Sequence, residues 1–592
     1  IVELYDKFFK KAFPDLQKKL GIVYTPVEVV DFIIRSVEDI LQSEFQSSLK
    51  NEGVHIIDPF TGTGTFITRL LQSGIIPADC LSEKYRSEIH ANEIVLLAYY
   101  IAAINIEATY HGILYGNADG KISGSLSGSL KPEYAPFNGI CLTDTFQMYE
   151  KGDLLNELLV DNSARRKRQK ALDIRVIIGN PPYSAGKKSA NDNNANVKYP
   201  HLDKRIADTY AANSSATLKS KAYDNYNRAI RWASDRIGNK GVIGFVTNAS
   251  FVDGSSKDGV RKCLADEFSS LYIFHLRGNA NTEGELRRKE KGNIFGEGTR
   301  TPIAISILVK NPDAEKQGQI YFHDIGDYLT REEKLATIAE LGSIKGISKD
   351  IGWQQITPDS FNDWLNQRDP NLNFDSYISL GDKKDKDTLV VFENYSLGVA
   401  TNRDAWVYNF SSSQLEQNMR STIDFYNSEV SRFQAACERL PENEQPDIDT
   451  FIDADASKIS WTRAIKRDLK NSKTHQFNRS EIVTALYRPF TKQKMYFNHS
   501  WNEMVLQIPK IFSNLKTDRS SENAVISVTG RGATKEFSAL ITNEIPDLEI
   551  ISKGQCFPMN LYEIEDAVSP NERTNERTKL YCINNPIHRA AA

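Results

Sequence analysis

The 592-residue sequence predicts an α/β protein whose first half is built on a largely parallel sheet and whose second half is a mixed α+β region. Two observations predict this class. Short apolar runs rich in Val and Ile alternate with helical patterns up to about residue 310. From about residue 361 the pattern changes, and a long helical stripe follows. The length also exceeds what one hydrophobic core supports, so several domain-sized units are expected.

The expected strands are short apolar runs, most of them closed by a polar residue, a glycine or a turn. Val176-Ile177-Ile178 is wholly apolar and β-branched, which suits a strand buried on both faces, and Gly179 and two prolines end it. The other strands are expected at 54–58, 89–93, 140–144, 242–247, 271–276 and 303–309. Helical patterns cover 1–20, 27–41, 67–71, 94–107 and 222–237.

Four segments are expected along the chain: an N-terminal segment at 1–50, a core at 51–312, a connector of strand and helix at 313–360 and a final domain at 361–592. In the last of these, Ser413-Gln414-Leu415-Glu416 resembles a capping box that opens a long amphipathic helix. A core or spacer helix is favoured over a dimeric coiled coil because the stripe is barely four heptads long. We therefore expect a monomer.

Composition excludes several classes of protein. The net charge of −4 means that any DNA-binding surface must be a local basic patch. The six cysteines are far apart without a Cys-x-x-Cys pair, which disfavours a metal site or a disulfide framework and favours a reducing cytoplasm. No apolar run is long enough to span a membrane. Because residue 1 is Ile in a helical pattern, we expect a piece of a longer polypeptide.

The tetrapeptide Asn180-Pro181-Pro182-Tyr183 directly follows the strand at 176–178. In open α/β sheets, ligands bind at the carboxyl ends of the strands. The tetrapeptide resembles the catalytic motif of S-adenosylmethionine-dependent amino methyltransferases, above all those that methylate adenine N6 in DNA. Enzymes that methylate protein glutamine amides carry it too, and an ordinary strand-to-turn junction is the plain alternative.

The resemblance implies a role for each residue of the motif. An exocyclic amine is a poor nucleophile because its lone pair is delocalised into the ring. The side-chain oxygen of Asn180 and the carbonyl of Pro181 would accept its hydrogens, and the rigid prolines, Pro182 included, would preorganise these acceptors. Tyr183 would stack on a base taken out of the duplex.

Acidic residues close three successive expected strands. Asp58, followed by Pro59-Phe60-Thr61-Gly62-Thr63-Gly64, resembles the methyltransferase cofactor loop, in which the acid faces the methionine ammonium. By the same resemblance, Glu93 would bind the ribose and Asp144 the adenine amino group. The resemblance thus implies a Rossmann-like seven-stranded core that binds S-adenosylmethionine through one set of residues: Tyr24, Thr25, Pro26, Asp58, Pro59, Thr61, Gly62, Gly64, Phe66, Glu93 and Asp144.

Residues 174–310 resemble the methyltransferase domain of the single-polypeptide Type ISP restriction–modification enzymes. The resemblance includes Asn191-Asp192-Asn193-Asn194, Tyr199-Pro200-His201-Leu202-Asp203 and Leu276-Arg277-Gly278-Asn279. In that family a nuclease and an ATP-driven translocase lie upstream, and a target-recognition domain follows the methyltransferase. The chain has no Gly-x-x-x-x-Gly-Lys-Ser/Thr loop, so its partners are expected to be the nuclease and ATPase of a parent polypeptide, together with double-stranded DNA.

Two basic segments are the candidates for DNA contact. Residues 461–500 hold nine Lys and Arg against Asp468 and Glu481, interleaved with aromatic residues. The second segment is the loop around Arg287, Arg288 and Lys289, where Phe295 could stack on the other face of an extruded base or simply pack against the sheet. A solvated basic face is the alternative for the first segment. Its candidate contacts are Arg463, Lys466, Arg467, Lys470 and Arg488.

The sequence therefore predicts a DNA adenine-N6 methyltransferase with its own target-recognition domain, with duplex DNA between the two halves. Two alternatives stay open. One is a specificity module that mainly positions a motor and nuclease, and the other is a protein-glutamine methyltransferase. The DNA sequence that is recognised cannot be derived from these patterns.

Overall fold

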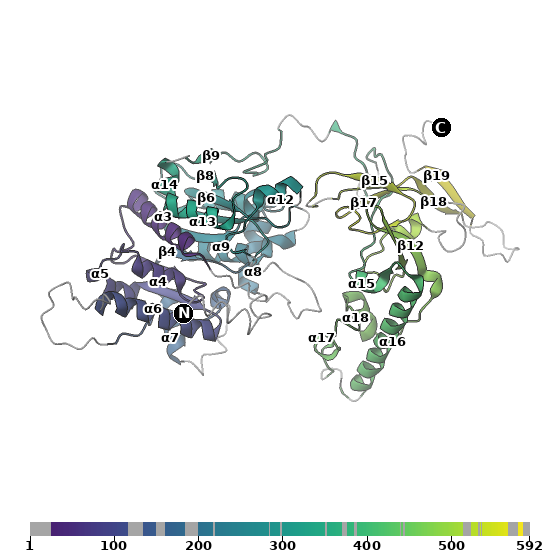
Figure 1. Cartoon of the computed structure of the whole chain (residues 1–592), viewed down its shortest axis with the longest axis horizontal. Coiled ribbons are helices and arrows are strands. Elements are labelled where there is room, and N and C mark those ends of the chain that lie inside the picture. The colour runs from purple at the N-terminus through teal and green to yellow at the C-terminus, as the bar shows by residue number, and fades with distance from the viewer. Residues whose placement is uncertain are drawn as a thin grey trace. The chain divides into compact units, whose positions relative to one another are not determined.

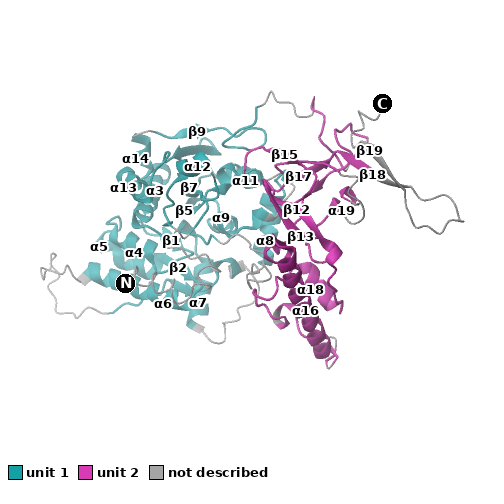
Figure 2. Ribbon diagram, turned by 45° about the vertical axis from the view of Figure 1, so that its right-hand side comes forward, with its two compact units in different colours: residues 1–187, 196–369 teal, residues 188–195, 370–592 magenta. Residues whose placement is uncertain are grey.

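The computed structural model divides the chain into two compact units, 1–187 with 196–369 and 188–195 with 370–592 (Figure 2). The described residues are 25–115, 134–149, 160–183, 199–216, 219–282, 284–296, 299–349, 352–369, 376–383, 387–438, 440–441, 445–512, 523–530, 533, 535–565 and 578–583. The helix expected at 1–20 and Tyr24 lie outside these ranges.

Unit 1 contains a nine-stranded mixed sheet in the order β3-β2-β1-β4-β5-β7-β6-β8-β9. Figure 1 labels β4, β6, β8 and β9 of this sheet. The strands from β3 to β5 are parallel, β7 is antiparallel to both of its neighbours, and β9 is antiparallel to β8. The strands are β1 (His55–Asp58), β2 (Ile89–Glu93), β3 (Ile140–Leu142), β4 (Ile174–Gly179), β5 (Gly241–Asn248), β6 (Ser270–Arg277), β7 (Ile303–Lys310), β8 (Gln319–Asp324) and β9 (Gln354–Ile356).

Strands β1 to β7 lie where the apolar runs predict them, but the sheet does not end there. β8 and β9 come from residues 313–360, which the sequence predicted to be a connector. β8 pairs in parallel with β6, and the alternating Ile320 and Phe322 are buried in the core. These short runs extend the sheet because the edge of β6 gives them hydrogen-bond partners. Unit 1 accordingly continues to residue 369 rather than ending at 312.

Both faces of the sheet are covered, as expected for parallel strands. Val176 and Ile178 of β4 pack into one hydrophobic cluster, and Ile177 packs into the other. The first cluster is covered by α3 (Val27–Phe45), α4 (Thr65–Gln72), α6 (Leu96–Tyr115), α13 (Arg331–Leu341) and α14 (Ile344–Lys349). The second is covered by α8 (Pro200–Ile206), α9 (Asn225–Arg236) and α11 (Asp258–Glu267).

Two local expectations need correction. The sequence Thr25-Pro26 predicts a helix capped by Thr25 with Pro26 in its first turn, but Pro26 is the N-cap residue of α3, and no side chain caps this helix. The polarity of residues 184–220 predicts a loop that orders over a substrate, but residues 200–206 form α8 and residues 207–211 form the π-helical turn η3 (Ala207–Ala211). Leu202 and Ile206 are buried, which gives this segment an apolar face that its overall polarity conceals.

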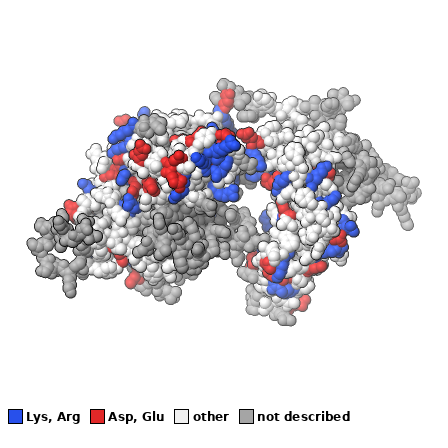
Figure 3. All heavy atoms as spheres, viewed as in Figure 1, with Lys and Arg blue, Asp and Glu red and all other residues white. Residues whose placement is uncertain are grey.

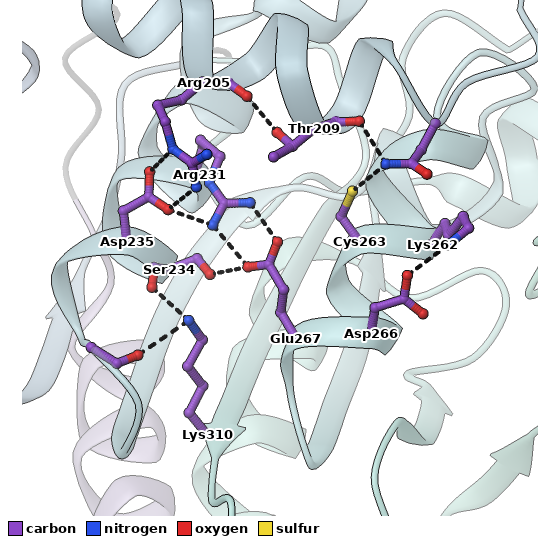
Figure 4. Close-up of polar contacts among 12 residues, drawn as sticks. Arg205, Thr209, Arg231, Ser234, Asp235, Lys262, Cys263, Asp266, Glu267 and Lys310 are labelled. Atoms are coloured by element: carbon purple, nitrogen blue, oxygen red, sulfur yellow. Dashed lines mark hydrogen bonds and ion pairs between the residues drawn. The ribbon is translucent and has the colours of Figure 1, made fainter.

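A network of charges joins three helices that cover the second cluster, and Lys310 of β7 donates to the Ser234 carbonyl beside it at 2.7 Å (Figure 4). Arg231 of α9 is 2% exposed and donates to both carboxylate oxygens of Glu267 at 2.6 and 2.8 Å. It also pairs with Asp235 at 2.7 Å, which is paired with Arg205 at 2.8 Å. The network links α8, α9 and α11, which cover the second face of the sheet.

Unit 2 is a mixed α+β unit with its own hydrophobic cluster. It holds two four-stranded sheets, β10-β17-β14-β15 and β11-β13-β12-β16, and the hairpin β18-β19. The long helix is α16 (Ser412–Cys437), and its buried stripe makes it a core helix. Its N-cap is Ser411, whose Oγ accepts the Gln414 N–H, instead of the expected Ser413. Cys437 packs at the edge of the cluster.

The strands of the sheets and hairpin of unit 2 are β10 (Ser396–Leu397), β11 (Tyr408–Asn409), β12 (Ile482–Arg488), β13 (Thr491–Tyr496), β14 (Val525–Val528), β15 (Ala539–Thr542), β16 (Ile545–Pro546), β17 (Gln555–Pro558), β18 (Asn560–Glu565) and β19 (Thr578–Ile583). Short helices connect them: α15 (Asp404–Val407), α17 (Ile448–Phe451), α18 (Arg463–Lys470) and α19 (Ile508–Ile511). Among the described residues, none of the helices is both long and apolar enough to cross a membrane.

Candidate active site

Asn180 lies immediately after β4, at the carboxyl end of the central strand of unit 1. Its Nδ2 donates a hydrogen bond to the Oγ1 of Thr25 at 2.9 Å, which joins two residues 155 positions apart. This bond orients the side-chain amide, because Nδ2 faces Thr25 and Oδ1 points away from it. Pro181 is buried, and Pro182 and Tyr183 are partly exposed.

The carboxylate of Asp58 is adjacent to this motif. Gly179 precedes Asn180, and a Cβ atom on Gly179 would lie 2.9 Å from Asp58 Oδ1. Asp58 is completely buried. Its Oδ1 accepts the N–H of Phe60 at 3.0 Å, and its Oδ2 has no hydrogen-bond partner among the described residues. Burial raises the pKa of Asp58 to about 8, because the charged form of a buried carboxyl is poorly solvated. A cation bound beside Asp58 would stabilise that charged form.

The loop after β1 is held in a tight turn by its glycines and its threonine. Gly62 and Gly64 have φ of +57° and +88°, a region that residues with a Cβ rarely adopt. Thr61 donates from Oγ1 to the carbonyl of Asp58 at 2.9 Å. The carbonyl of Pro59 accepts the Oγ1–H of Thr145 at 2.6 Å. This geometry presents backbone groups, rather than long side chains, at the edge of the sheet.

Phe66 does not belong to this surface. Its side chain is 3% exposed and packs in the hydrophobic cluster beneath the loop. The resemblance placed it among the cofactor contacts because it follows the loop in sequence. In the structure it is the first apolar residue of the inward face of α4, so its side chain is a core residue.

Glu93 closes the second strand and is buried. Its two oxygens accept the N–H of Gly62 at 2.8 Å and of Val95 at 2.7 Å. Burial raises the pKa of Glu93 to about 7. The bond to Gly62 ties the acid of the second strand to the glycine turn of the first. Each oxygen retains a lone pair that can accept a hydroxyl.

Asp144 follows the third strand, and it has a partner that the sequence did not identify. Its Oδ2 accepts the hydroxyl of Tyr199 at 3.0 Å, and its Oδ1 accepts the N–H of Phe146. Tyr199 packs edge-to-face on Phe146, with ring centroids 5.3 Å apart. Arg228 lies over the Tyr199 ring at 5.2 Å. Tyr199 occurs within the predicted loop at 184–220, so only its position in the family resemblance could have marked it.

The three acids thus lie at the carboxyl ends of three adjacent parallel strands. Asp58 fits an ammonium group because it is a buried carboxyl with an unpartnered oxygen in the described part of the chain. Glu93 and Asp144 are acceptors suited to a diol and an amino group. These residues fit S-adenosylmethionine. The described residues include no cluster of three or more His, Cys, Asp or Glu side chains that could hold a metal ion.

The structure also brings the two candidate base-contacting rings together. Tyr183 and Phe295 contact each other with centroids 5.5 Å apart and planes inclined by 64°. The hydroxyl of Tyr183 donates to the carbonyl of Val246 at 3.1 Å. Phe295 follows the short basic helix α12 (Gly284–Glu290), over which Lys and Arg gather on one face of the molecule (Figure 3). There Arg288 is 78% exposed, while Arg287 donates to the carbonyl of Lys291 and Lys289 pairs with Asp327.

The basic residues of this segment of unit 2 fall into two groups: some are exposed, and others form ion pairs within the unit. Arg463, Arg467 and Lys470 lie on the exposed face of α18, and no ion pair to them is found in the described part of the chain. Lys466 is 9% exposed and pairs with Asp449 at 2.7 Å. Lys466 is therefore a structural residue, because its position on the helix turns it toward the core.

Arg488 also contacts other residues of unit 2. It pairs with Asp547 at 2.9 Å and lies 3.9 Å over the ring of Tyr487. Most aromatic residues of this segment serve the core, as the buried Trp461 and Tyr496 show. Phe490 differs, because it is fully exposed at the turn between β12 and β13.

Two family models match this chain in sequence. The model described as N-6 DNA Methylase matches residues 1–269. The model described as Type ISP C-terminal specificity domain matches residues 390–584. The two matches fall in different units of the structure. A search of curated proteins found no match.

Three solved structures are similar to the chain over nearly its whole length. A nuclease-deletion mutant of the Type ISP restriction-modification enzyme LlaGI with a DNA substrate mimic has 44% identity and a TM-score of 0.82, covering 95% of this chain and 43% of that one. The ATP-dependent Type ISP enzyme LlaBIII bound to DNA has 39% identity and a TM-score of 0.84, covering 100% and 36%. The DrdV–DNA complex has 37% identity and a TM-score of 0.82, covering 95% and 51%. The chain therefore spans about half or less of each relative.

Proposed function

We propose that this chain, which belongs to the Type ISP restriction–modification family, is a sequence-specific DNA N6-adenine methyltransferase with its own target-recognition region. The proposal rests on the contact between the Asn-Pro-Pro-Tyr motif and the loop that carries Asp58. Gly179, the residue before the Asn-Pro-Pro-Tyr motif, lies against the buried Asp58 carboxyl. A cationic methyl donor and an amine acceptor would meet at that point.

The topology supports a methyltransferase core within the larger sheet. The first seven strands follow the order 3-2-1-4-5-7-6 with only β7 reversed. We regard these strands as the Rossmann-like core expected from the sequence, and β8 and β9 as an extension of it. The carboxyl ends of β1, β2 and β4 then form the edge where cofactor and substrate bind.

S-Adenosylmethionine would supply the electrophilic methyl group at this edge. Asp58 would bind its ammonium, Glu93 its ribose hydroxyls and Asp144 its adenine amino group, with Thr25 and Pro26 beside them. Asn180 would accept a hydrogen of the adenine amine through Oδ1, because Thr25 occupies Nδ2. The carbonyl of Pro181 would accept the second hydrogen. This places charge stabilisation where positive charge develops on the amine nitrogen.

The target adenine must leave the duplex to reach Asn180. Tyr183 and Phe295 would contact the extruded base, and the basic residues of α12 and α18 would contact phosphates. The solved structures of LlaGI, LlaBIII and DrdV each include DNA or a DNA substrate mimic, which supports duplex DNA as the partner here. A nuclease and an ATP-dependent motor of the parent polypeptide would be further partners, in the bacterial cytoplasm.

The protein-glutamine alternative loses its basis, because residues 390–584 match a specificity domain of DNA-modifying enzymes. The test is incubation with labelled S-adenosylmethionine and duplexes of varied sequence. We expect label in adenine of one duplex sequence and none in protein. Label in protein glutamine, or no transfer to any duplex, would overturn the proposal.

Asn180→Ala gives the corresponding residue test. Loss of an acceptor that acts in the transition state typically costs ~3–4 kcal/mol, so turnover should fall by at least about 100-fold. Affinity for cofactor and duplex should stay within several-fold, as measured by calorimetric titration. Near-normal turnover would remove Asn180 from the mechanism.

A further inference from the structure

The segment Lys291–Gly296 connects α12 to the aromatic pair of the candidate site. It carries Phe295, whose ring contacts Tyr183. Asn293 shapes the segment from inside, since its Nδ2 donates to the carbonyls of Gly278 and Thr301, both at 3.0 Å. Its Oδ1 accepts the N–H of Phe295 at 3.0 Å. The position of the Phe295 ring therefore depends on how this segment is anchored.

Helix α13 anchors the segment through a buried lysine. Lys334 is 0% exposed, and its Nζ donates to the carbonyl of Glu290 at 3.0 Å and of Gly292 at 2.6 Å. Arg331, one turn earlier, donates from Nε to the carbonyl of Ile294 at 2.9 Å. Gly292 is so close to this helix that a Cβ atom would lie 2.4 Å from the backbone nitrogen of Arg331.

An ammonium group is costly to bury, so Lys334 depends on the carbonyls that it contacts. Burial lowers the pKa of Lys334 to about 8. The same helix is fixed in the core by Leu335 and Ile338, which pack with residues of α3. Thr25, the partner of Asn180, lies two residues before α3. One framework, α3 with α13, thus supports both Asn180 and the segment that carries Phe295.

We propose that Lys334 is a positioning residue for the target base. It holds the segment Lys291–Gly296 so that the Phe295 ring stays against Tyr183, where an extruded adenine is received. Lys334 touches neither cofactor nor substrate and acts through the backbone of this segment. The proposal rests on the proposed function for the identity of the base, but the anchoring itself can be measured without it.

The experiment compares Lys334→Met with Lys334→Arg and with a matched control. The control is Lys84→Met, because Lys84 is 2% exposed and donates to the carbonyls of Asn51 and Val54, far in sequence from Phe295. Lys84 also pairs with the buried Glu88, so this variant should lose at least as much stability as Lys334→Met. Three quantities are measured. The first is hydrogen exchange of residues 290–296, and the second is the fluorescence of 2-aminopurine placed at the target adenine of the duplex sequence that the protein methylates. The third is kcat, determined together with KM for the cofactor.

Lys334→Met should accelerate exchange in 290–296, lower the 2-aminopurine signal and reduce kcat on the order of 10–100-fold, as small misplacements do. KM for cofactor should stay unchanged, and Lys334→Arg should restore part of the signal. Lys84→Met should leave all three quantities near wild type. If Lys334→Met fails to fold, Arg331→Met must show the same pattern more weakly, because its side chain is 42% exposed.

Two results overturn the proposal. One is normal exchange in residues 290–296 of the lysine variant, which would mean that the segment is anchored elsewhere. The other is faster exchange with unchanged kcat and fluorescence, which would make the contact structural only. A wild-type chain that methylates no duplex contradicts the proposed function instead, and the exchange measurement still decides whether Lys334 anchors the segment.

Discussion

Asp58 is a fully buried acid that accepts one hydrogen bond and has no ion pair among the described residues. Its pKa of about 8 and the pKa of Glu93 of about 7 both result mainly from burial. Such carboxyls are unfavourable for folding when they ionise. Their arrangement favours binding of a cation over stability, as expected at a functional site.

The first prediction concerns the pH dependence of stability without cofactor. A carboxyl whose pKa is higher in the folded than in the unfolded protein releases its proton on unfolding. The stability contributed by these two carboxyls should therefore fall as pH rises from about 4 to about 8 and level off above that value. This contribution is isolated as the difference between wild type and variant, because the buried His90, whose pKa burial lowers to about 3, acts in the opposite direction below about pH 6.5. Asp58→Asn should remove most of the loss of stability that occurs between pH 7 and 8. Glu93→Gln should affect only the loss of stability that occurs below about pH 7. The measurement is the Tm of unit 1 across this pH range.

Cofactor binding should show the opposite trend. Affinity should rise with pH from 6 to 8, because Asp58 must lose its proton before it can pair with an ammonium. Asp58→Asn should bind weakly and with little pH dependence in titration calorimetry. A mutant that keeps the wild-type profile in both experiments would show that Asp58 is not the ammonium ligand.

Among the elements, the helix layer that contains α8, α9 and α11 is joined by the buried Arg231 network (Figure 4). Removing one partner of a buried ion pair leaves the other charge unpaired. Arg231→Met should therefore destabilise unit 1 by about 3 kcal/mol, the lower end of the usual range, because Glu267 and Asp235 are about a quarter exposed. Urea unfolding measures the change.

Lys262 provides the matched control within the same layer. It pairs with Asp266 at 2.7 Å, but the two side chains are 40% and 61% exposed. Lys262→Met should change stability by no more than about 0.5 kcal/mol. Equal effects of the two substitutions would mean that the buried network adds nothing beyond a surface pair.

Helix α18 carries exposed cations that are proposed to contact DNA phosphates. Its exposed cations, Arg463, Arg467 and Lys470, are spaced to lie on one face, opposite the buried Ile465 and Leu469. Replacing the three cations with Ala should weaken duplex binding and reduce the salt slope by about one unit for each phosphate that is no longer neutralised. Cofactor affinity should not change, since α18 belongs to unit 2.

Lys466→Ala serves as the comparison for the triple substitution. Because Lys466 pairs with Asp449 and is nearly buried, its loss should lower stability and leave the salt slope intact. If the triple variant binds DNA normally at every salt concentration, the face of α18 is only solvated. The phosphate contacts would then be expected around α12.

At the scale of the whole molecule, the chain has separate hydrophobic clusters in its two units. The family matches follow the same division, with the methylase model in unit 1 and the specificity model in unit 2. Units with separate cores can unfold separately. The regions that match the methylase and specificity models thus have independent sources of stability.

Calorimetry of the intact chain should accordingly show two unfolding transitions. The demethylated cofactor product at 100 times its Kd should stabilise unit 1 by roughly 2.7 kcal/mol and leave the transition of unit 2 in place. Trp501, buried in unit 2, reports on that unit in fluorescence when the other tryptophans are replaced. A single transition, or equal shifts of both, would contradict this division.

Local sequence patterns were sufficient for strands β1 to β7 and for the motif residues themselves. A β-branched apolar run closed by glycine and proline, such as 176–182, has few conformations other than a buried strand and a turn. The Asn180-Pro181-Pro182-Tyr183 tetrapeptide and the loop after Asp58 are each continuous in sequence, so a sequence motif alone can identify them. The core helix at 412–437 was likewise predictable from its apolar period.

Contacts between distant segments were decided only by the tertiary structure. No periodic pattern connects Asn180 with Thr25, Asp144 with Tyr199, or Lys334 with Gly292. The same holds for the buried Phe66 and Lys466, because composition shows that a residue is apolar or charged but not which neighbour it faces. The sequence predicted strand and helix at 313–360, but only the tertiary structure decides that β8 and β9 extend the main sheet, because the edge of β6 supplies their hydrogen bonds.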